Sequence, residues 1–150
     1  MIFGMGSRTR QRSVFAAALL VCLCPVALSA ESVSVSPTRL MLPPGAKQAA
    51  LTVSAKQLER RASVQVRVMS WKYGTPADRL SKTRDVVASP PITKLKPRQE
   101  LTVRVVRVAK KPVRGRECYR VLVDTLHPKA EDQLVNLRVR HSVPLCFTGK

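Results

Sequence analysis

The sequence predicts an all-β protein, and three observations support that prediction. Short stretches of alternating apolar and polar residues recur between residues 33 and 147, and a period of two is typical of half-buried β-strands. Clusters of Pro, Gly and Ser, such as 43–45 and 89–91, separate these stretches and indicate turns. No segment keeps a helical period, and residues 55–61 have room for one helical turn at most. About seven short strands in one chain of this size predict an immunoglobulin-like β-sandwich.

The first half of the sandwich is predicted to hold three strands. Residues 33–42 form the first, and Pro37 indicates an edge position or a kink because proline lacks a ladder N–H. Residues 49–54 form the second strand. The third is centred on residues 64–71, where valines alternate with polar side chains. A polar loop is expected at residues 74–84.

The second half is predicted from the same alternation, with one irregularity. Between Val105 and Val106 the apolar residues change parity, which indicates a β-bulge that would keep Val106 and Val108 on the buried side. A basic loop at 110–115 and a second loop at 127–133 flank the strand that follows. The predicted strands of this half are 85–88, 92–95, 101–108, 118–126 and 134–147.

The last predicted strand, 134–147, is much longer than the usual five to six residues or so. A long apolar strand at the end of a domain is expected at a sheet edge. Its unpaired backbone N–H and C=O groups would promote aggregation there unless another segment covers them or a partner pairs with them. One use is pairing with a strand of another protein. Its apolar residues share one parity, broken only by His141; they are Val135, Leu137, Val139, Val143, Leu145 and Phe147.

Residues 1–30 are predicted to be a secretory signal peptide. Three arginines precede an apolar run at 14–28, and Leu28-Ser29-Ala30 is a suitable cleavage site. The alternative is a membrane anchor, but the run is short for a span of about 20 apolar residues and Pro25 interrupts it. We therefore expect an exported single domain at residues 31–150, without stable membrane insertion after cleavage.

The exported chain is strongly basic, with 24 Lys and Arg against 9 acidic residues, or +15. This charge suits nucleic acid, an anionic membrane surface or an acidic partner. The cations are spread along the chain, however, and six aromatic residues are too few to stack on single strands. We interpret most of the cations as solvated strand faces and loops, and we expect no nucleic-acid partner.

Two cysteines, Cys118 and Cys146, lie outside the predicted signal peptide, and export favours a disulfide between them. In an antiparallel hairpin, opposing residue numbers have a constant sum. Here 118 and 146 sum to 264, which centres the hairpin on residue 132, inside the loop predicted at 127–133. The two cysteines would then face each other. The alternative is two free cysteines.

No pattern in the sequence points to catalysis. The only histidines are His127 and His141, and neither has metal-ligand spacing with a cysteine. The six glycines form no phosphate-binding loop, and no nucleophile motif surrounds a serine. We therefore predict that the protein is not an enzyme and needs no cofactor or metal.

Seven short segments, taken in order, carry a family resemblance. They are Val35-Ser-Pro-Thr-Arg39-Leu, Val64-Gln-Val-Arg-Val-Met-Ser-Trp71, Ser89-Pro-Pro-Ile92, Leu95-Lys-Pro97 with Gln99, Val103-Arg104-Val-Val-Arg107, Arg116-Glu117-Cys-Tyr119-Arg-Val-Leu-Val and Ser142-Val-Pro-Leu-Cys-Phe147. Together they resemble the N-terminal domain of the periplasmic pilus-assembly chaperones of the chaperone–usher pathway. The Ser-Val-Pro ending is similar to the archaic, spore-coat-protein-like branch.

The resemblance implies a periplasmic chaperone whose partners are pilus subunits and an outer-membrane usher. Subunits of these systems lack their final strand, and the chaperone fills the open groove with its own last strand. Here the donor residues would be Val135, Leu137 and Val139. Parity alone does not separate this role from that of an ordinary core face.

The resemblance also implies a site for the subunit's terminal carboxylate. Arg39 matches a basic residue of the family, and a guanidinium binds a carboxylate through two parallel hydrogen bonds. The alternative is a solvated strand arginine. The family's second basic residue is a lysine of the last strand, where this chain has Pro144. Arg104 and His141 are weaker candidates for that role. A disulfide between the last two strands also occurs in some family members.

Two departures from the family pattern stand out. Family members carry a second sandwich domain, and this chain stops where the link to it would begin, so we expect that domain to be absent. Arg98 stands in a turn where glycine is common, and a turn needing positive φ there would be strained.

Two other functions stay open at this point. In the first, the chain is an exported structural β-sandwich. Such a protein would itself be a pilus or surface component and would pair its edges with copies of itself. Alternatively, it is an exported polyanion-binding module, whose phosphate contacts would weaken steeply with salt.

Overall fold

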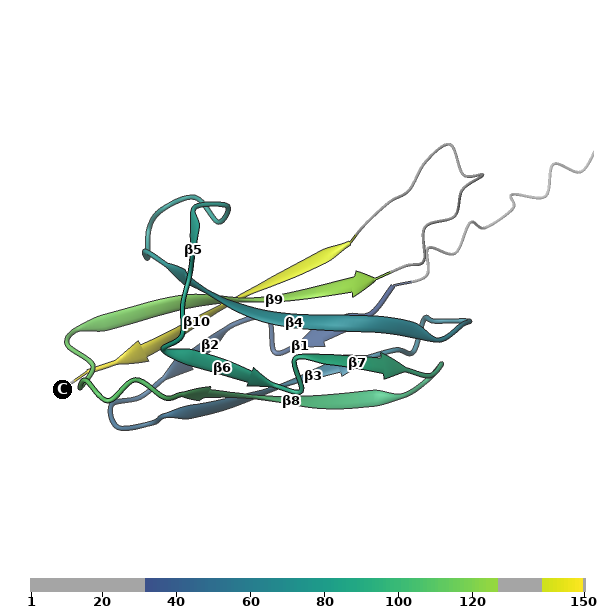
Figure 1. Cartoon of the computed structure of the whole chain (residues 1–150), viewed down its shortest axis with the longest axis horizontal. Helices are drawn as coiled ribbons and strands as arrows, with labels where there is room; N and C mark the ends of the chain where they lie inside the picture. The colour runs from purple at the N-terminus through teal and green to yellow at the C-terminus, as the bar shows by residue number, and fades with distance from the viewer. Residues whose placement is uncertain (1–31, 127–138, 150) are drawn as a thin grey trace, which may run out of the picture.

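The computed structural model describes residues 32–126 and 139–149, which form a two-layered β-sandwich (Figure 1). This confirms the predicted all-β, immunoglobulin-like class. The strands of the described residues are β1 (Ser34–Ser36), β2 (Leu40–Leu42), β3 (Gln48–Ser54), β4 (Ala62–Trp71), β5 (Leu80–Lys82), β6 (Val86–Ser89), β7 (Ile92–Leu95), β8 (Glu100–Arg107), β9 (Arg116–Leu126) and β10 (Arg140–Thr148).

The strands divide into two sheets. One sheet has the order β1-β3-β8-β6, and the other has the order β2-β10-β9-β4-β5, with β7 also paired to β4. In Figure 1 the layer of β4, β9 and β10 lies above the layer that contains β3 and β8. All pairs are antiparallel except β2 and β10, which run parallel.

The core lies between the sheets and is built by alternate residues of the long strands. Because successive side chains of a strand point to opposite faces, each strand offers one apolar row to the interior. Tyr119 and Phe147 meet edge to face there, with ring centroids 6.0 Å apart. The largest fully buried side chains include Leu51, Val53, Val64, Leu95, Val103, Val105, Val121, Val123, Leu145 and Phe147.

The structure has more than the seven or so predicted strands, because one predicted strand divides in two and a predicted loop contains a short strand. The predicted first strand divides at Pro37 into β1 and β2, which belong to different sheets. Pro37 has no N–H to donate, so the ladder ends there, and the Ser36–Pro37 peptide is cis. The short strand β5 lies in the segment that was predicted to be a loop, where it pairs with the end of β4.

The predicted bulge in β8 is wrong. β3 and β8 pair in unbroken register from Gln48 opposite Val106 to Ser54 opposite Glu100. The strand therefore keeps its period of two, which turns Arg107 inward at 7% exposure and leaves Val108 at 51% exposure. The register persists because the ladder keeps its hydrogen bonds and the buried guanidinium is paired with a carboxylate.

The partners of Arg107 explain how a cation is accepted there. Its Nε and Nη2 donate to the two carboxylate oxygens of Glu117 at 3.0 and 3.1 Å, and Nη1 donates to the Ala109 carbonyl at 2.9 Å. A bidentate pair of this kind offsets much of the cost of removing the guanidinium from water.

The predicted hairpin of the last two strands is confirmed. Every pair from Arg140 opposite Asp124 to Thr148 opposite Arg116 has the constant sum of 264. Cys118 and Cys146 face each other in this register and form a disulfide. Residues 127–138 lie outside the described residues, as do residues 1–30 of the predicted signal peptide. No helix that is long and apolar enough to span a membrane occurs in the described ranges.

Candidate functional site

The most distinctive feature of β10 is an edge that is only partly paired. β9 covers one side of β10 from Arg140 to Thr148, but β2 covers the other side only from Leu145 to Phe147. In the described part of the chain, the stretch 140–144 therefore has one free backbone edge. Such an edge can accept a further strand.

The exposure of side chains changes along one face of β10. Phe147 and Leu145 are fully buried and Val143 is 4% exposed, whereas Val139, of the same parity, is 36% exposed. The row of apolar residues thus leaves the core of this domain between Val143 and Val139. Parity did not separate donor residues from core residues, but this change in exposure places Val139 outside the core.

Two of the three predicted donor residues, Val135 and Leu137, lie outside the described residues. Val139 immediately precedes β10 and lines a cavity of about 420 Å³ together with Leu126. Leu126 is also 42% exposed. The described ends of the two hairpin strands therefore carry apolar side chains that are open to solvent.

An ion-pair network fixes the base of this free edge. Asp124 on β9 accepts hydrogen bonds from Arg67 on β4, at 2.6 Å, and from Arg140 on β10. Burial alone would raise the pKa of Asp124, but the hydrogen bonds and charges of Arg140 and Arg67 outweigh it and hold the pKa below its usual value. One carboxylate thus ties β4, β9 and β10 together near the described ends of the hairpin strands.

The predicted carboxylate ligand, Arg39, lies just before β2 and is exposed. It lines a shallow concavity of about 300 Å³ together with Met41, Trp71, Tyr73, Gly74, Thr75, Arg120 and Pro144. The structure therefore places Arg39 and Pro144 around the same concavity. No ion pair or hydrogen bond holds the Arg39 side chain within the described ranges.

The two weaker candidates lie elsewhere. Arg104 is on β8 in the other sheet, opposite Ala50 and Ser89. His141 is on β10, on the parity of the core residues, and its Nε2 is buried without a partner. Neither residue lines the concavity of Arg39.

Sequence reasoning missed Arg120, which shares the concavity with Arg39. Arg120 lies directly opposite Pro144 in the β9–β10 ladder. Its guanidinium carbon is 4.1 Å from the centre of the Trp71 ring, a distance typical of a cation–π contact. The signal was available in the sequence, because 120 and 144 sum to the same 264 that pairs the cysteines.

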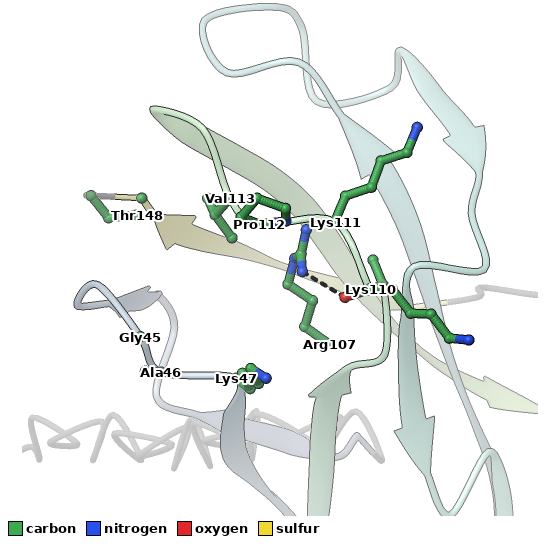
Figure 2. A pocket seen from close by; sticks show the side chains of 11 residues that line it. Gly45, Ala46, Lys47, Arg107, Lys110, Lys111, Pro112, Val113 and Thr148 are labelled. Atoms are coloured by element: carbon green, nitrogen blue, oxygen red, sulfur yellow. Dashed lines mark hydrogen bonds between the residues drawn. The ribbon is translucent and has the colours of Figure 1, made fainter.

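A separate cavity of about 520 Å³ lies between the turn at Gly45, the segment that follows β8, and the end of β10 (Figure 2). The buried Arg107 is one of the residues that line it. The ammonium groups of Lys110 and Lys111 point away from each other (Figure 2). Because Arg107 is already paired with Glu117, this cavity offers no cluster of free, converging cations. Nor do the described residues contain three His, Cys, Asp or Glu side chains placed to hold a metal ion.

Residues 32–148 match the family model of pili and flagellar-assembly chaperones, PapD N-terminal domain. No curated protein sequence gives a significant match.

Three solved structures illustrate the likeness. The chaperone–tip subunit complex CsuC–CsuE, from the archaic chaperone–usher Csu pili of Acinetobacter baumannii, has a TM-score of 0.66 at 25% identity, over 79% of this chain and 52% of that chain. The Escherichia coli chaperone DraB has a TM-score of 0.59 at 24% identity, over 79% of this chain and 55% of that chain. The SafA pilin–SafB chaperone complex of Salmonella enterica has a TM-score of 0.63 at 23% sequence identity. The match covers 82% of this chain and 57% of that chain. This chain therefore spans little more than half the length of the chains it matches.

Proposed function

This chain belongs to the family of pili and flagellar-assembly chaperones through its PapD-type N-terminal domain, and from this premise we propose that it is a periplasmic chaperone for pilus subunits. It binds a subunit by lending residues 134–139 together with the start of β10, and it delivers the subunit to an outer-membrane usher. The single observation that carries this proposal is the free backbone edge of β10 at 140–144.

Strand addition needs two kinds of contact, and the free edge of β10 supplies the first of them. Main-chain N–H and C=O groups pair with the incoming strand, and alternate apolar side chains enter its groove. Val139 is the described member of that row, and Leu137 and Val135 continue it. Fully burying a side chain of this size contributes about 1.5–3 kcal/mol, from which the cost of ordering the segment is subtracted.

The position of β2 relates the direction of an incoming strand to the place where its terminal carboxylate would lie. β2 pairs with β10 in parallel, starting with Leu40 opposite Leu145. A strand that occupies the free edge at 140–144 would end where β2 begins, next to Arg39. Its terminal carboxylate reaches Arg39 only if that strand also runs parallel to β10. We therefore assign Arg39 to the carboxylate and a parallel direction to the bound strand.

Co-expression in a bacterial periplasm tests the proposal. A tagged form of residues 31–150 is produced together with pilus subunits from the same genome, and captured subunits are identified by mass spectrometry. We expect a subunit to be recovered with the wild-type chain and lost with Leu137→Glu, while the variant keeps the wild-type circular dichroism spectrum. Recovery of the subunit in equal amounts with both chains would contradict strand donation.

A further inference from the structure

One end of the sandwich carries a group of exposed cations, on the loop that joins β8 to β9 and on the turn before β3. We call Lys47, Lys110, Lys111 and Arg114 the basic end. All four are exposed, and none has an ion-pair partner within the described ranges. The cavity of about 520 Å³ is lined by the three lysines, and a second concavity is lined by Lys111 and Arg114. The four cations therefore share one surface.

The acidic residues near the basic end leave it positively charged. Glu117 is already paired with the buried Arg107. Asp85 lies beside the start of the loop, because its carbonyl accepts hydrogen bonds from two loop N–H groups at 2.8 and 3.2 Å. The exposed Arg84 precedes Asp85 in the chain. Neither acid therefore offsets the four cations, and an anion would meet a net positive charge.

The loop of the basic end is anchored on both sides. At its start, Arg107 Nη1 donates to the Ala109 carbonyl at 2.9 Å. At its end, the Gly149 N–H donates to the Gly115 carbonyl at 2.7 Å. A Cβ on Gly149 would collide with the Val113 carbonyl oxygen, so the close approach requires glycine at this position. Because these contacts hold the loop, a ligand would bind a surface that is already ordered.

The directions of the lysine side chains distinguish between classes of anion. The ammonium groups of Lys110 and Lys111 point away from each other (Figure 2), so the two cannot close on one small anion. Residues 108–115 include no aromatic side chain on which a nucleic-acid base could stack. Diverging cations can each meet a different headgroup where negative charge is spread over a plane, as it is in a membrane that contains anionic lipids.

Apolar side chains lie among these cations. Val108 is 51% exposed, and Pro112 is exposed as well. Surfaces that bind a membrane interface combine both kinds of contact. Their cations are attracted by anionic headgroups, and their apolar groups are buried at the boundary with the acyl chains. This mixture favours a lipid surface over a purely polar polyanion.

We propose that the basic end is a docking site for an anionic phospholipid surface, to which the chain adsorbs end-on. Arg116, which follows the loop, lies opposite Thr148 in the β9–β10 ladder, whereas the free edge begins at Arg140, at the other end of β10. A chain docked in this way keeps its free edge in solution. The inference goes beyond subunit binding, and the proposed periplasmic location places phospholipid surfaces within reach.

Vesicle sedimentation tests the inference. It uses residues 31–150, which contain the whole described sandwich and omit the apolar run at 14–28 that would itself bind lipid. We expect the chain to bind vesicles that mix phosphatidylglycerol with phosphatidylcholine, and not vesicles of phosphatidylcholine alone. Lys110→Gln together with Lys111→Gln should weaken this binding by about 25-fold, because each cation near an anionic surface contributes roughly fivefold.

Arg60→Gln together with Arg61→Gln is the matched control, because it removes the same charge from the other end of the sandwich. The two arginines precede β4, where Ser63 lies opposite Leu126 at the far end of β9. The 11 residues of β9 separate the two ends by about 35 Å, which is several times the Debye length of about 8–10 Å. This variant should bind within about twofold of the wild type.

Val108→Ser tests the apolar part of the contact. It should remove the binding that persists at high salt, because ions screen charges but not apolar contacts. Ile92→Ser is its control. Ile92 is 57% exposed on β7, outside the basic end, and its replacement should leave vesicle binding unchanged at either salt concentration. All these positions are exposed, and urea unfolding checks that each variant keeps its fold.

Four results would overturn the inference. Equal binding to neutral vesicles would mean that headgroup charge plays no part, and equal losses in the two double variants would mean that the charge acts diffusely. Displacement by inorganic phosphate beyond that by chloride at equal ionic strength would indicate a site for single phosphates. In the lysine variant, a larger loss for duplex DNA than for vesicles would assign the basic end to nucleic acid. A chain that captures the subunit but binds no vesicles loses this inference and keeps the proposed function.

Discussion

Cys118 on β9 lies directly opposite Cys146 on β10, with their Cα atoms 4.2 Å apart, and a disulfide joins them. The bridge sits beneath Trp71 on the outer face of the larger sheet. It therefore fixes the register of the hairpin at one end, while the Asp124 network fixes it at the other. Between these two points runs the free edge of β10.

Loss of the disulfide is expected to destabilise the fold considerably. The two cysteines are 28 residues apart in the sequence. In the chain-entropy model, a crosslink that closes a loop of this length restricts the unfolded chain and adds about 3–4 kcal/mol to the free energy of unfolding. The double substitution Cys118→Ser with Cys146→Ser should lower the free energy of unfolding in urea by this order. Adding reductant to the wild type should have a similar effect, and an unchanged unfolding midpoint in both cases would contradict the prediction.

Arg98 is expected to be a site where substitution stabilises the protein. Its φ is 62°, a left-handed conformation that costs a residue with a Cβ about 1–2 kcal/mol. Arg98→Gly removes this cost but adds freedom to the unfolded chain, so we expect a net gain of up to about 1 kcal/mol. Arg98→Ala, which keeps the Cβ, is the control and should gain nothing. Thermal and urea unfolding of the three proteins measure the difference.

The turn at Arg98 illustrates what the sequence alone can predict. Local chemistry and the constant sum of a hairpin are properties of the chain itself, so the strained turn, the cysteine pair and the strand register were all predictable. Arg107 was not, because its burial depends on Glu117, ten residues away on another strand. Arg120 lay within reach of the register argument, but its stacking on Trp71 depends on how β4 packs beside β9.

The Arg107–Glu117 pair is expected to be sensitive to the removal of one partner. Glu117→Ala leaves a buried guanidinium without its carboxylate, which should destabilise the fold by roughly 2–4 kcal/mol. The double substitution Arg107→Met with Glu117→Ala removes the buried charge and should recover part of that loss. Urea unfolding of both variants gives the comparison, and a double variant less stable than Glu117→Ala would refute the assignment.

Stability is expected to depend on pH through Asp124. Its folded-state pKa is lowered by Arg140 and Arg67 against the opposing effect of burial. The ionised carboxylate therefore stabilises the fold above its unfolded-state pKa of about 4, and this contribution is lost as the pH falls through the folded-state pKa. Asp124→Asn should lower the free energy of unfolding at pH 7 by about 1–2 kcal/mol.

The pH dependence supplies the control for that assignment. The difference in stability between the wild type and Asp124→Asn should shrink steadily below about pH 4, because the wild-type carboxyl becomes protonated as well. Urea titrations at several pH values between 7 and 2 measure it. A difference that stays constant over this range would mean that the network acts through packing and not through charge.

The difference in side-chain exposure between Val143 and Val139 leads to a prediction about function. Val143 and Val139 share one face of the chain four residues apart, but Val143 is 4% exposed and Val139 is 36% exposed. Val143→Asp places a charge in the core and should destabilise the domain by several kcal/mol, roughly the loss seen for a buried unpaired charge.

Val139→Asp should instead leave the free energy of unfolding within about 0.5 kcal/mol of the wild type, as is usual for exposed positions. It should nevertheless abolish recovery of the pilus subunit in the co-expression experiment, because the charge would have to enter the subunit's apolar groove. Urea unfolding and subunit capture on the same preparations separate the two effects. If Val139→Asp unfolds the domain, Val139 belongs to its core. If the folded variant still captures the subunit, the donated strand does not include Val139.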